Sequence, residues 1–379
     1  MSKQFIIALI AAVCFIACGK NKNNSNEETK DASVKGNKVI AYVMRGNNNW
    51  GENNEKAKQI THINYAFANI VNGKVVEGYE SDVANLKKLN QLKQVNKDLK
   101  ILISVGGWSW SKNFSDAALT PASREIFAQS AVDFMIKHNI DGIDLDWEYP
   151  GQKGDNNKFR LEDKENFTAV LKLLREKLDD ISNMKNQYLL TIATAANQKY
   201  LDHTNMSEAH QYLDFINIMT YDFFTGGSSQ TGHHSNLSQS DYADNGSSAK
   251  KAVEEHVNAG IPIEKLVLGV PFYGRWWKGV NPNNNGLYQI ANGKRGSYRY
   301  KLIADSLSNK TFVSLWDSKA NAPYIWRKKD SLFLTYESPK SLKIKVDYLK
   351  NKKMGGIMFW EYNGDNDELL TVISNTINN

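Results

Sequence analysis

Three carboxylic acids stand at alternate positions in the segment 141–150. The segment reads DGIDLDWEYP, and the three acids are Asp144, Asp146 and Glu148. If this segment is a β-strand, the three side chains share one face, whereas Asp141 points to the other. Carboxylates that are crowded together and removed from water repel one another, which raises at least one pKa and favours a shared proton. The pattern therefore predicts an acid that stays protonated at neutral pH.

A bound cation is the alternative interpretation of the same acids, because carboxylate oxygens are the ligands that Mg²⁺ and Ca²⁺ prefer. The neighbouring Trp147 and Tyr149 supply few further oxygen ligands, however. The histidines show no metal-ligand spacing, and they stand at His62, His138, His203, His210, His233, His234 and His256. We expect no metal and no cofactor, and we expect the pair at 233–234 to shape the site rather than bind a metal.

The acids require a scaffold, and the chain from Val39 onward alternates strand-like and helical patterns. Strand-like apolar runs occupy 39–44, 62–70, 100–107, 142–149, 189–196, 215–223, 266–274 and 355–362. Segments between them, such as 121–139 and 162–181, carry apolar residues at helical spacing. This alternation predicts a TIM (β/α)8 barrel of the α/β class, whose active site is formed at the C-terminal ends of the strands.

One interval breaks the alternation. About eighty residues separate the last two strand-like runs, which is too many for a loop. The pieces 298–305, 312–317, 322–327 and 331–336 look like strands of their own. We therefore predict a small α+β insertion domain at 278–339, between strands seven and eight of a catalytic domain that covers 38–379. The helix before strand eight should begin near Ser338, with the lysine-rich stretch 340–353 as a solvated face.

The start of the chain has the pattern of an export signal. Lys3 precedes an apolar run at 5–17, which is too short to anchor the chain by spanning a bilayer. The sequence FIAC at 15–18 resembles a bacterial lipobox, so we interpret 1–17 as a lipoprotein signal peptide and Cys18 as the lipidated residue. An ordinary signal peptide that is cleaved nearby is the alternative. The polar residues 18–37 then form a flexible tether, and the protein is exported and lipid-anchored to the bacterial outer membrane or cell surface.

Composition excludes several other classes. The only cysteines are Cys14 and Cys18, both in the leader, so the mature domain has no disulfide. The 47 basic and 41 acidic side chains give a net charge of +6 without a long basic block, so we expect no nucleic-acid partner. We expect a monomer.

Five motifs together resemble those of one enzyme family. DGIDLDWEYP is similar to the DxxDxDxE signature of the family 18 glycoside hydrolases, which are chitinases with a TIM barrel. SVGGW (104–108), MTYD (219–222), PFYGR (271–275) and GGIMFWEYNGD (355–365) resemble the third-, sixth-, seventh- and eighth-strand motifs of that family. The resemblance extends over 39–365, includes the position of the insertion, and implies hydrolysis of β-1,4-linked N-acetylglucosamine in chitin or chitooligosaccharides.

The resemblance also implies roles for the acids. Glu148 is the general acid that protonates the glycosidic oxygen and then the base toward water, while the 2-acetamido carbonyl of the substrate attacks the anomeric carbon, so that the configuration is retained. Asp146 orients the acetamido group, Asp144 shares a proton with Asp146, and Tyr221 donates its hydroxyl to the acetamido oxygen. Asp141 is expected to be structural.

Aromatic side chains suit a sugar substrate, because the faces of pyranose rings are apolar and stack on flat groups. By the same resemblance, Trp360 forms the floor under the cleaved sugar and Asp222 helps to bind it in a strained form. The other residues expected to line the cleft are Trp108, Met219, Tyr273, Arg275, Tyr42 and Phe67. For each aromatic residue, packing inside the barrel is the alternative.

Two other functions use the same residue set. One is a non-catalytic, lectin-like chitin-binding protein, and the other is an endo-β-N-acetylglucosaminidase that acts on glycoproteins. The presence of all three acids and of Tyr221 favours an enzyme. The inserted domain favours chitin, since in the family it walls a deep cleft.

Overall fold

The computed structural model describes residues 37–46, 54–182, 187–243 and 246–378. The expected signal peptide, the expected lipidation site Cys18 and the tether up to residue 36 lie outside these residues. The described residues form one compact unit. Among the described residues, no helix combines the length and the apolar character needed to cross a membrane.

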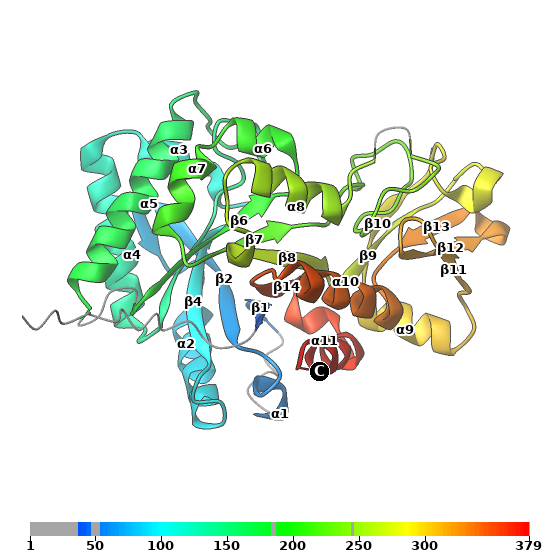
Figure 1. Cartoon of the computed structure of the whole chain (residues 1–379), viewed down its shortest axis with the longest axis horizontal. Helices are drawn as coiled ribbons and strands as arrows, with labels where there is room; N and C mark the ends of the chain where they lie inside the picture. The colour runs from blue at the N-terminus through cyan, green and yellow to red at the C-terminus, as the bar shows by residue number, and fades with distance from the viewer. Residues whose placement is uncertain (1–36, 47–53, 183–186, 244–245, 379) are drawn as a thin grey trace, which may run out of the picture. The chain divides into compact units, whose positions relative to one another are not determined.

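A closed ring of parallel strands forms the centre of this unit (Figure 1). The strands are β1 (Lys38–Met44), β2 (His62–Val71), β4 (Lys100–Gly106), β5 (Gly142–Asp146), β6 (Leu189–Ala195), β7 (Phe215–Met219), β8 (Leu266–Pro271) and β14 (Gly356–Trp360). They pair in the order β1-β14-β8-β7-β6-β5-β4-β2, and a pairing of β1 with β2 closes the ring. The predicted TIM barrel is confirmed. The short strand β3 (Lys74–Val76) pairs in antiparallel fashion with the C-terminal end of β2, at Asn69–Val71.

Alternating side chains build two apolar layers, as strand geometry requires. On β1, Ile40 and Tyr42 join the buried cluster inside the barrel, together with Phe215, Val267 and Met358. Their neighbours in the sequence, at 39, 41 and 43, join the larger cluster between the barrel and its helices.

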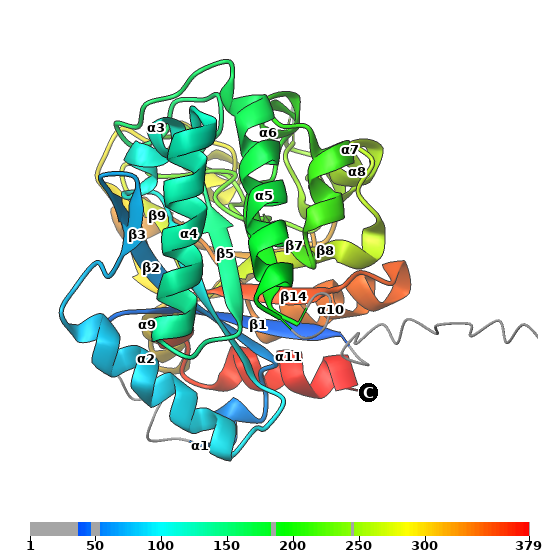
Figure 2. The same cartoon turned by 90° about the vertical axis from the view of Figure 1, so that its left-hand side faces the viewer.

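Helices cover the outside of the barrel, and Figure 2 shows α4 (Pro121–Lys137) and α5 (Asp163–Asp180) in front of β5. Thr120 caps α4, because its side chain accepts a hydrogen bond from the amide of Ser123. Both helices lie within two residues of their predicted limits. The other α-helices around the barrel are α1 (Asn54–Ala57), α2 (Ser81–Gln91), α3 (Phe114–Ala118), α6 (Gln198–Asp202), α7 (Met206–Ala209), α8 (Ala249–Asn258), α10 (Pro339–Lys352) and α11 (Glu368–Asn378).

A second, antiparallel sheet is inserted in the sequence between β8 and β14, two strands that pair directly with each other in the barrel (Figure 1). Its strands are β9 (Tyr273–Trp277), β10 (Arg295–Arg299), β11 (Ser314–Asp317), β12 (Ala322–Arg327) and β13 (Leu332–Thr335), and they pair in the order β10-β9-β13-β12-β11. The strand predicted at 298–305 is wrong, because the chain forms α9 (Tyr300–Ser308) after Arg299. The buried Tyr300 and Ile303 are three residues apart, which suits one face of a helix. The boundaries 278–339 stay a prediction, although β9 already begins at Tyr273.

Helix α10 begins directly after its cap Ser338, as predicted, but one expectation for it is wrong. Lys345 does not lie on a solvated face, since its side chain is fully buried.

Candidate active site

A cleft of about 1080 Å³ opens at the C-terminal ends of the barrel strands. Except for Asp144, every side chain predicted to be catalytic or substrate-binding lines it. These residues are Tyr42, Phe67, Trp108, Asp146, Glu148, Met219, Tyr221, Asp222, Tyr273, Arg275 and Trp360. Strand ends that are far apart in the sequence therefore meet in one cavity, as the barrel topology requires.

Asp144 lies beneath the cleft, fully buried in the barrel. Its carboxylate accepts hydrogen bonds from Tyr42 Oη at 2.9 Å, Ser104 Oγ at 2.7 Å, Thr191 Oγ1 at 2.6 Å and Asn217 Nδ2 at 3.4 Å. These donors come from β1, β4, β6 and β7, so Asp144 points to the barrel axis. Burial raises the pKa of Asp144, and the hydrogen bonds offset part of that rise.

Asp146 ends β5, and Glu148 lies two residues further into the cleft; both are buried. Burial, followed by the negative charges of Glu148 and Asp144, raises the pKa of Asp146 well above its usual range. Burial also raises the pKa of Glu148 to about 7. A hydrogen bond with Tyr149 lowers this pKa in part, and the negative charge of Asp222 raises it further. Within the described part of the chain, Asp146 Oδ1 has no hydrogen-bond partner. Glu148 can therefore donate a proton at neutral pH, and the neighbouring Asp146 Oδ1 can accept a hydrogen bond from a ligand.

The turn that carries Glu148 is held by the end of β4 and the residues after it. Ser111 Oγ accepts from the amide of Glu148 at 2.9 Å and lies 3.0 Å from the carbonyl oxygen of Asp146. The amide of Gly107 donates to the same carbonyl at 2.8 Å. At Gly106 an added Cβ would come within 2.5 Å of it. The glycines of SVGGW therefore allow the backbone to approach the acid-bearing turn.

Asp222 turns into the cleft after β7 with a left-handed φ of 59°. Arg275 on β9 donates two hydrogen bonds to its carboxylate, from Nε to Oδ1 at 2.8 Å and from Nη2 to Oδ2 at 2.6 Å. The Nδ1 atom of the buried His234 lies 3.6 Å from Oδ1. Burial alone would raise the pKa of Asp222, but His234 and Arg275 hold it below its usual range. Asp222 is therefore a fixed negative charge in the cleft.

Tyr221, the neighbour of Asp222, is a hydrogen-bond donor on the same wall. Burial and the nearby carboxylates raise the pKa of its hydroxyl well above the usual range. The phenol therefore keeps its proton throughout the neutral pH range.

Trp360 lies among aromatic rings at the end of β14. Its ring stacks on Phe67 with centroids 5.5 Å apart and an angle of 21°, and it lies 5.8 Å from the ring of Tyr42. At the rim, Trp108 is 51% exposed and makes an edge contact with Tyr149 at 6.4 Å. The flat rings of Trp360 in the cleft and of Trp108 at its rim suit the apolar faces of sugar rings.

Several cleft residues were not singled out from the sequence. They include Met44, Arg45, Tyr79, Trp110, Tyr149, Arg299 and Glu361. The guanidinium of Arg45 lies 3.2 Å from the ring centre of Tyr79, and Tyr79 contacts Trp110 at 5.2 Å. Tyr149 and Glu361 lie inside matched motifs, and Trp110 follows one closely, so these three could have been found. Arg45 and Tyr79 carry no local signal, because tertiary packing brings them together.

The remaining candidates of the sequence lie elsewhere. Asp141 accepts a hydrogen bond from the amide of Ile101 at 2.8 Å and pairs with Lys93 at 2.6 Å, at the end of β5 opposite to the cleft. His233 is buried 3.2 Å from Asp317. Over the described ranges, no group of three or more His, Cys, Asp or Glu side chains is arranged to hold a metal ion.

Comparison with known proteins identifies consistent relatives. The family described as Glycosyl hydrolases family 18 matches residues 38–365. Chitinase A1 of Niallia circulans is 39% identical over 375 residues, which cover 82% of this chain and 54% of that protein. The chain thus spans about half the length of this relative. Chitinase B of Serratia marcescens is 30% identical over 82% of this chain and 74% of its own length.

Solved structures give the same result. A family 18 N-acetylglucosaminidase from Paenibacillus barengoltzii has a TM-score of 0.83 and 39% identity, covering 90% of this chain and 99% of that one. Chitinase ChiA74 from Bacillus thuringiensis has a TM-score of 0.82 and 32% identity, covering 90% of this chain and 70% of that one.

Proposed function

Since the chain belongs to glycosyl hydrolases family 18, we propose that it is a chitinase that hydrolyses the β-1,4 linkages between N-acetylglucosamine units. The observation that carries this proposal is Glu148, a buried carboxyl with a pKa of about 7, in a cleft of about 1080 Å³. Asp146 lies next to it, and Trp360 lines the same cleft.

Glu148 starts the reaction by giving its proton to the glycosidic oxygen. As that C–O bond breaks, the carbonyl oxygen of the substrate's own 2-acetamido group bonds to the anomeric carbon and forms an oxazolinium ion. Glu148, now a carboxylate, takes a proton from water, and the resulting hydroxide opens the ion. The sugar leaves with its original β configuration after two inversions, and the acid is restored.

Asp146 and Asp144 support the acetamido group in this scheme. The free Oδ1 of Asp146 accepts the acetamido N–H, which orients the carbonyl for attack. Asp144 and Asp146 share a proton as Glu148 changes its charge, and the raised pKa values of both support this role. Tyr221 donates its hydroxyl to the acetamido oxygen.

Residues on the walls of the cleft bind the sugar in this scheme. Trp360 stacks under the sugar that is cleaved, supported by Phe67 and Tyr42. Asp222, with Arg275 behind it, accepts a hydrogen bond from the strained sugar. Three further residues complete the binding surface, namely Trp108, Met219 and Tyr273.

Incubation with the N-acetylglucosamine hexamer, followed by product analysis over time, tests the proposal. We expect shorter oligomers with newly formed β anomers, and no cleavage of the fully deacetylated hexamer, which lacks the attacking group. Binding of the hexamer without release of sugar would mean that the protein is a lectin-like binding protein and not an enzyme. Preferred cleavage of a high-mannose glycoprotein would indicate an endo-β-N-acetylglucosaminidase.

Exo-acting release of single N-acetylglucosamine units is a second candidate. It is favoured by the Paenibacillus barengoltzii N-acetylglucosaminidase, 99% of which is covered by this chain. The same hexamer experiment separates the two functions, because only the second gives monosaccharide and pentamer as the first products.

We also propose that the protein is exported as a monomer and attached to the outer membrane or cell surface through Cys18. The lipobox-like FIAC sequence and the position of both cysteines in the leader support this. In cells fed labelled palmitate, we expect label on the protein, and Cys18→Ser should abolish it and move the protein to the soluble fraction. Light scattering on the detached domain checks the monomer.

A further inference from the structure

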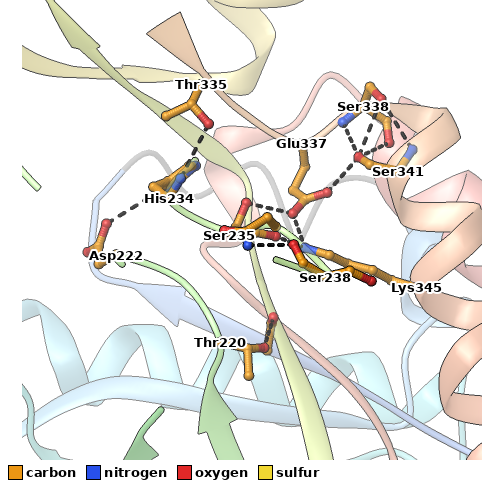
Figure 3. A network of polar contacts seen from close by, with 12 residues as sticks. Thr220, Asp222, His234, Ser235, Ser238, Thr335, Glu337, Ser338, Ser341 and Lys345 are labelled. Atoms are coloured by element: carbon orange, nitrogen blue, oxygen red, sulfur yellow. Dashed lines mark hydrogen bonds and ion pairs between the residues drawn. The ribbon is translucent and has the colours of Figure 1, made fainter. Parts of the chain in front are cut away.

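A buried ion pair lies between α10 and the loop that follows β7 (Figure 3). Lys345 on α10 is 0% exposed, Glu337 just before α10 is 1% exposed, and Lys345 Nζ pairs with Glu337 Oε1. Neither residue lines the cleft. Since both ions lose their hydration, a buried pair of this kind contributes little net stability compared with apolar residues of the same size. Its contribution therefore lies in the position of the residues that it contacts.

The pair holds Ser235 from two sides. Lys345 Nζ donates to the carbonyl oxygen of Ser235, and Ser235 Oγ donates to Glu337 Oε1 at 2.7 Å. Ser341 Oγ, in the first turn of α10, donates to Glu337 Oε2 at 2.6 Å. Direct hydrogen bonds thus fix residues that are more than a hundred positions apart in the sequence.

His234, the neighbour of Ser235, connects this point to the cleft. Its amide donates to Thr335 Oγ1 at 3.3 Å, and its carbonyl accepts from the amide of Phe223 at 3.1 Å. Its ring nitrogen Nδ1 lies 3.6 Å from Asp222 Oδ1. Figure 3 shows His234 between Asp222 on one side and Ser235 with the ion pair on the other.

We propose that Lys345 and Glu337 are positioning residues that fix Asp222 in the cleft through Ser235 and His234. The proposal rests on the proposed function, in which Asp222 binds the strained sugar. The two residues touch no substrate. Arg275 holds Asp222 from another direction, so loss of the ion pair should misplace Asp222 without freeing it.

The first test replaces both ions with neutral side chains, in the double variant Lys345→Met/Glu337→Gln. Because no buried charge is left unpaired, this variant should fold with a melting temperature near that of the wild type. On the acetylated hexamer, we expect kcat to fall about 10-fold with KM within about 2-fold, since misplacement by a fraction of an ångström acts mainly on the transition state. A merely structural pair would leave kcat unchanged.

A matched control uses another largely buried ion pair, which lies at the opposite end of the barrel. Arg175 Nη1 and Asp214 Oδ2 are 3.3 Å apart, and Arg175 is 7% exposed. Arg175 also pairs with Asp179 at 2.9 Å and donates to the carbonyl oxygen of Tyr188 at 2.9 Å, so Arg175→Met/Asp214→Asn removes these contacts as well. This variant should lower the melting temperature and leave kcat within about 2-fold of the wild type. An equal fall of kcat in this control would overturn the proposal.

A mutant cycle with Asp222→Asn tests the route. If the pair acts through Asp222, adding Lys345→Met/Glu337→Gln to Asp222→Asn should lower kcat by less than about 2-fold further. A further fall as large as that in the wild-type background would show that the pair does not act through Asp222.

Hydrogen exchange of the free protein gives a measurement that does not need activity. We expect peptides that cover 220–236 to exchange at least about 5-fold faster in Lys345→Met/Glu337→Gln than in the wild type and the control, because Phe223 loses the fixed carbonyl of His234. If the wild type cleaves no acetylated hexamer, the proposed function fails but this measurement still decides the positioning. Unchanged exchange overturns it.

Discussion

The guanidinium of Arg275 holds both carboxylate oxygens of Asp222, at 2.8 and 2.6 Å. Although burial favours the neutral acid, this pairing and His234 keep the pKa of Asp222 below its usual range. Asp222 therefore remains charged, and its charge adds to the effect of burial on the pKa of Glu148. The residue that we propose to bind the sugar thus also raises the pKa of the acid.

The pH dependence of hydrolysis should follow the acid. Glu148 must be protonated to donate, and burial places its pKa at about 7, so kcat/KM should fall as the pH rises through about 7. Rates on the acetylated hexamer from pH 5 to pH 9 check this. An alkaline limb that begins only above pH 9 would assign the proton to another group.

Asp222→Asn should move that limb toward lower pH, because a negative charge that raises the pKa of Glu148 is removed. Asp146 and Tyr149 still face Glu148 in the variant. Because burial is the largest cause of the raised pKa and remains, the pKa of Glu148 should stay above its ordinary value. The exposed Asp133→Asn, on the outer helix α4, is the control and should not move the limb. A shift to higher pH would contradict the assigned interaction.

Glu148→Gln should lower kcat by about 10²-fold to 10⁴-fold, the usual contribution of a general acid. The amide keeps the shape and a hydrogen bond, so affinity for the acetylated hexamer should stay within about 3-fold of the wild type. Steady-state rates and calorimetric titration measure the two effects. Turnover close to that of the wild type would remove Glu148 from the mechanism.

Glu148→Gln should also be more stable than the wild type above neutral pH. The pKa of Glu148 rises from 4.5 to about 7 on folding, so the folded state binds its proton more tightly and the free energy of unfolding falls as the pH rises from 4.5 to about 7. Glu148→Gln removes this loss, which amounts to at most about 3 kcal/mol.

Urea unfolding at pH 5 and pH 8 measures the difference. The gain should be small at pH 5 and largest at pH 8. The exposed Glu165→Gln on α5 serves as the control and should show no such dependence. A gain that is equal at both pH values would mean that the glutamine acts by packing and not through the proton.

Trp360→Ala should lower kcat/KM on the hexamer by at least about 10-fold, which corresponds to about 1.4 kcal/mol of lost stacking. Trp316 on β11, which lies under the ammonium of Lys340 in the inserted sheet, offers the matched control. Trp316→Ala should leave kcat/KM within about 2-fold. Equal losses in both variants would point to folding rather than to sugar binding.

Much of the barrel and the cleft could be predicted, because period-two alternation places Asp144 and Asp146 on one face and the barrel topology brings strand ends together. The helix at Tyr300–Ser308 was predicted as a strand, since a short run with many apolar and aromatic residues fits either structure. Tertiary packing decides between them, and α9 packs against β9 and β10 of the inserted sheet.

The buried Lys345 could not be recognised in a stretch where six of the fourteen residues at 340–353 are lysines. Its environment is set by Glu337 and by the backbone of Ser235, which is 110 positions away. The same holds for Arg45 and Tyr79, whose contact joins two separate loops. Such pairs become visible only when the chain is folded.

The barrel begins with β1 at Lys38, and all its strands run in parallel toward the cleft. Any support that is joined to the chain upstream of Lys38 is therefore connected at the end remote from the cleft. Immobilisation on a resin through the N-terminal segment should leave the opening free to meet insoluble particles. Attachment through exposed lysines, by contrast, would fix the enzyme in random orientations.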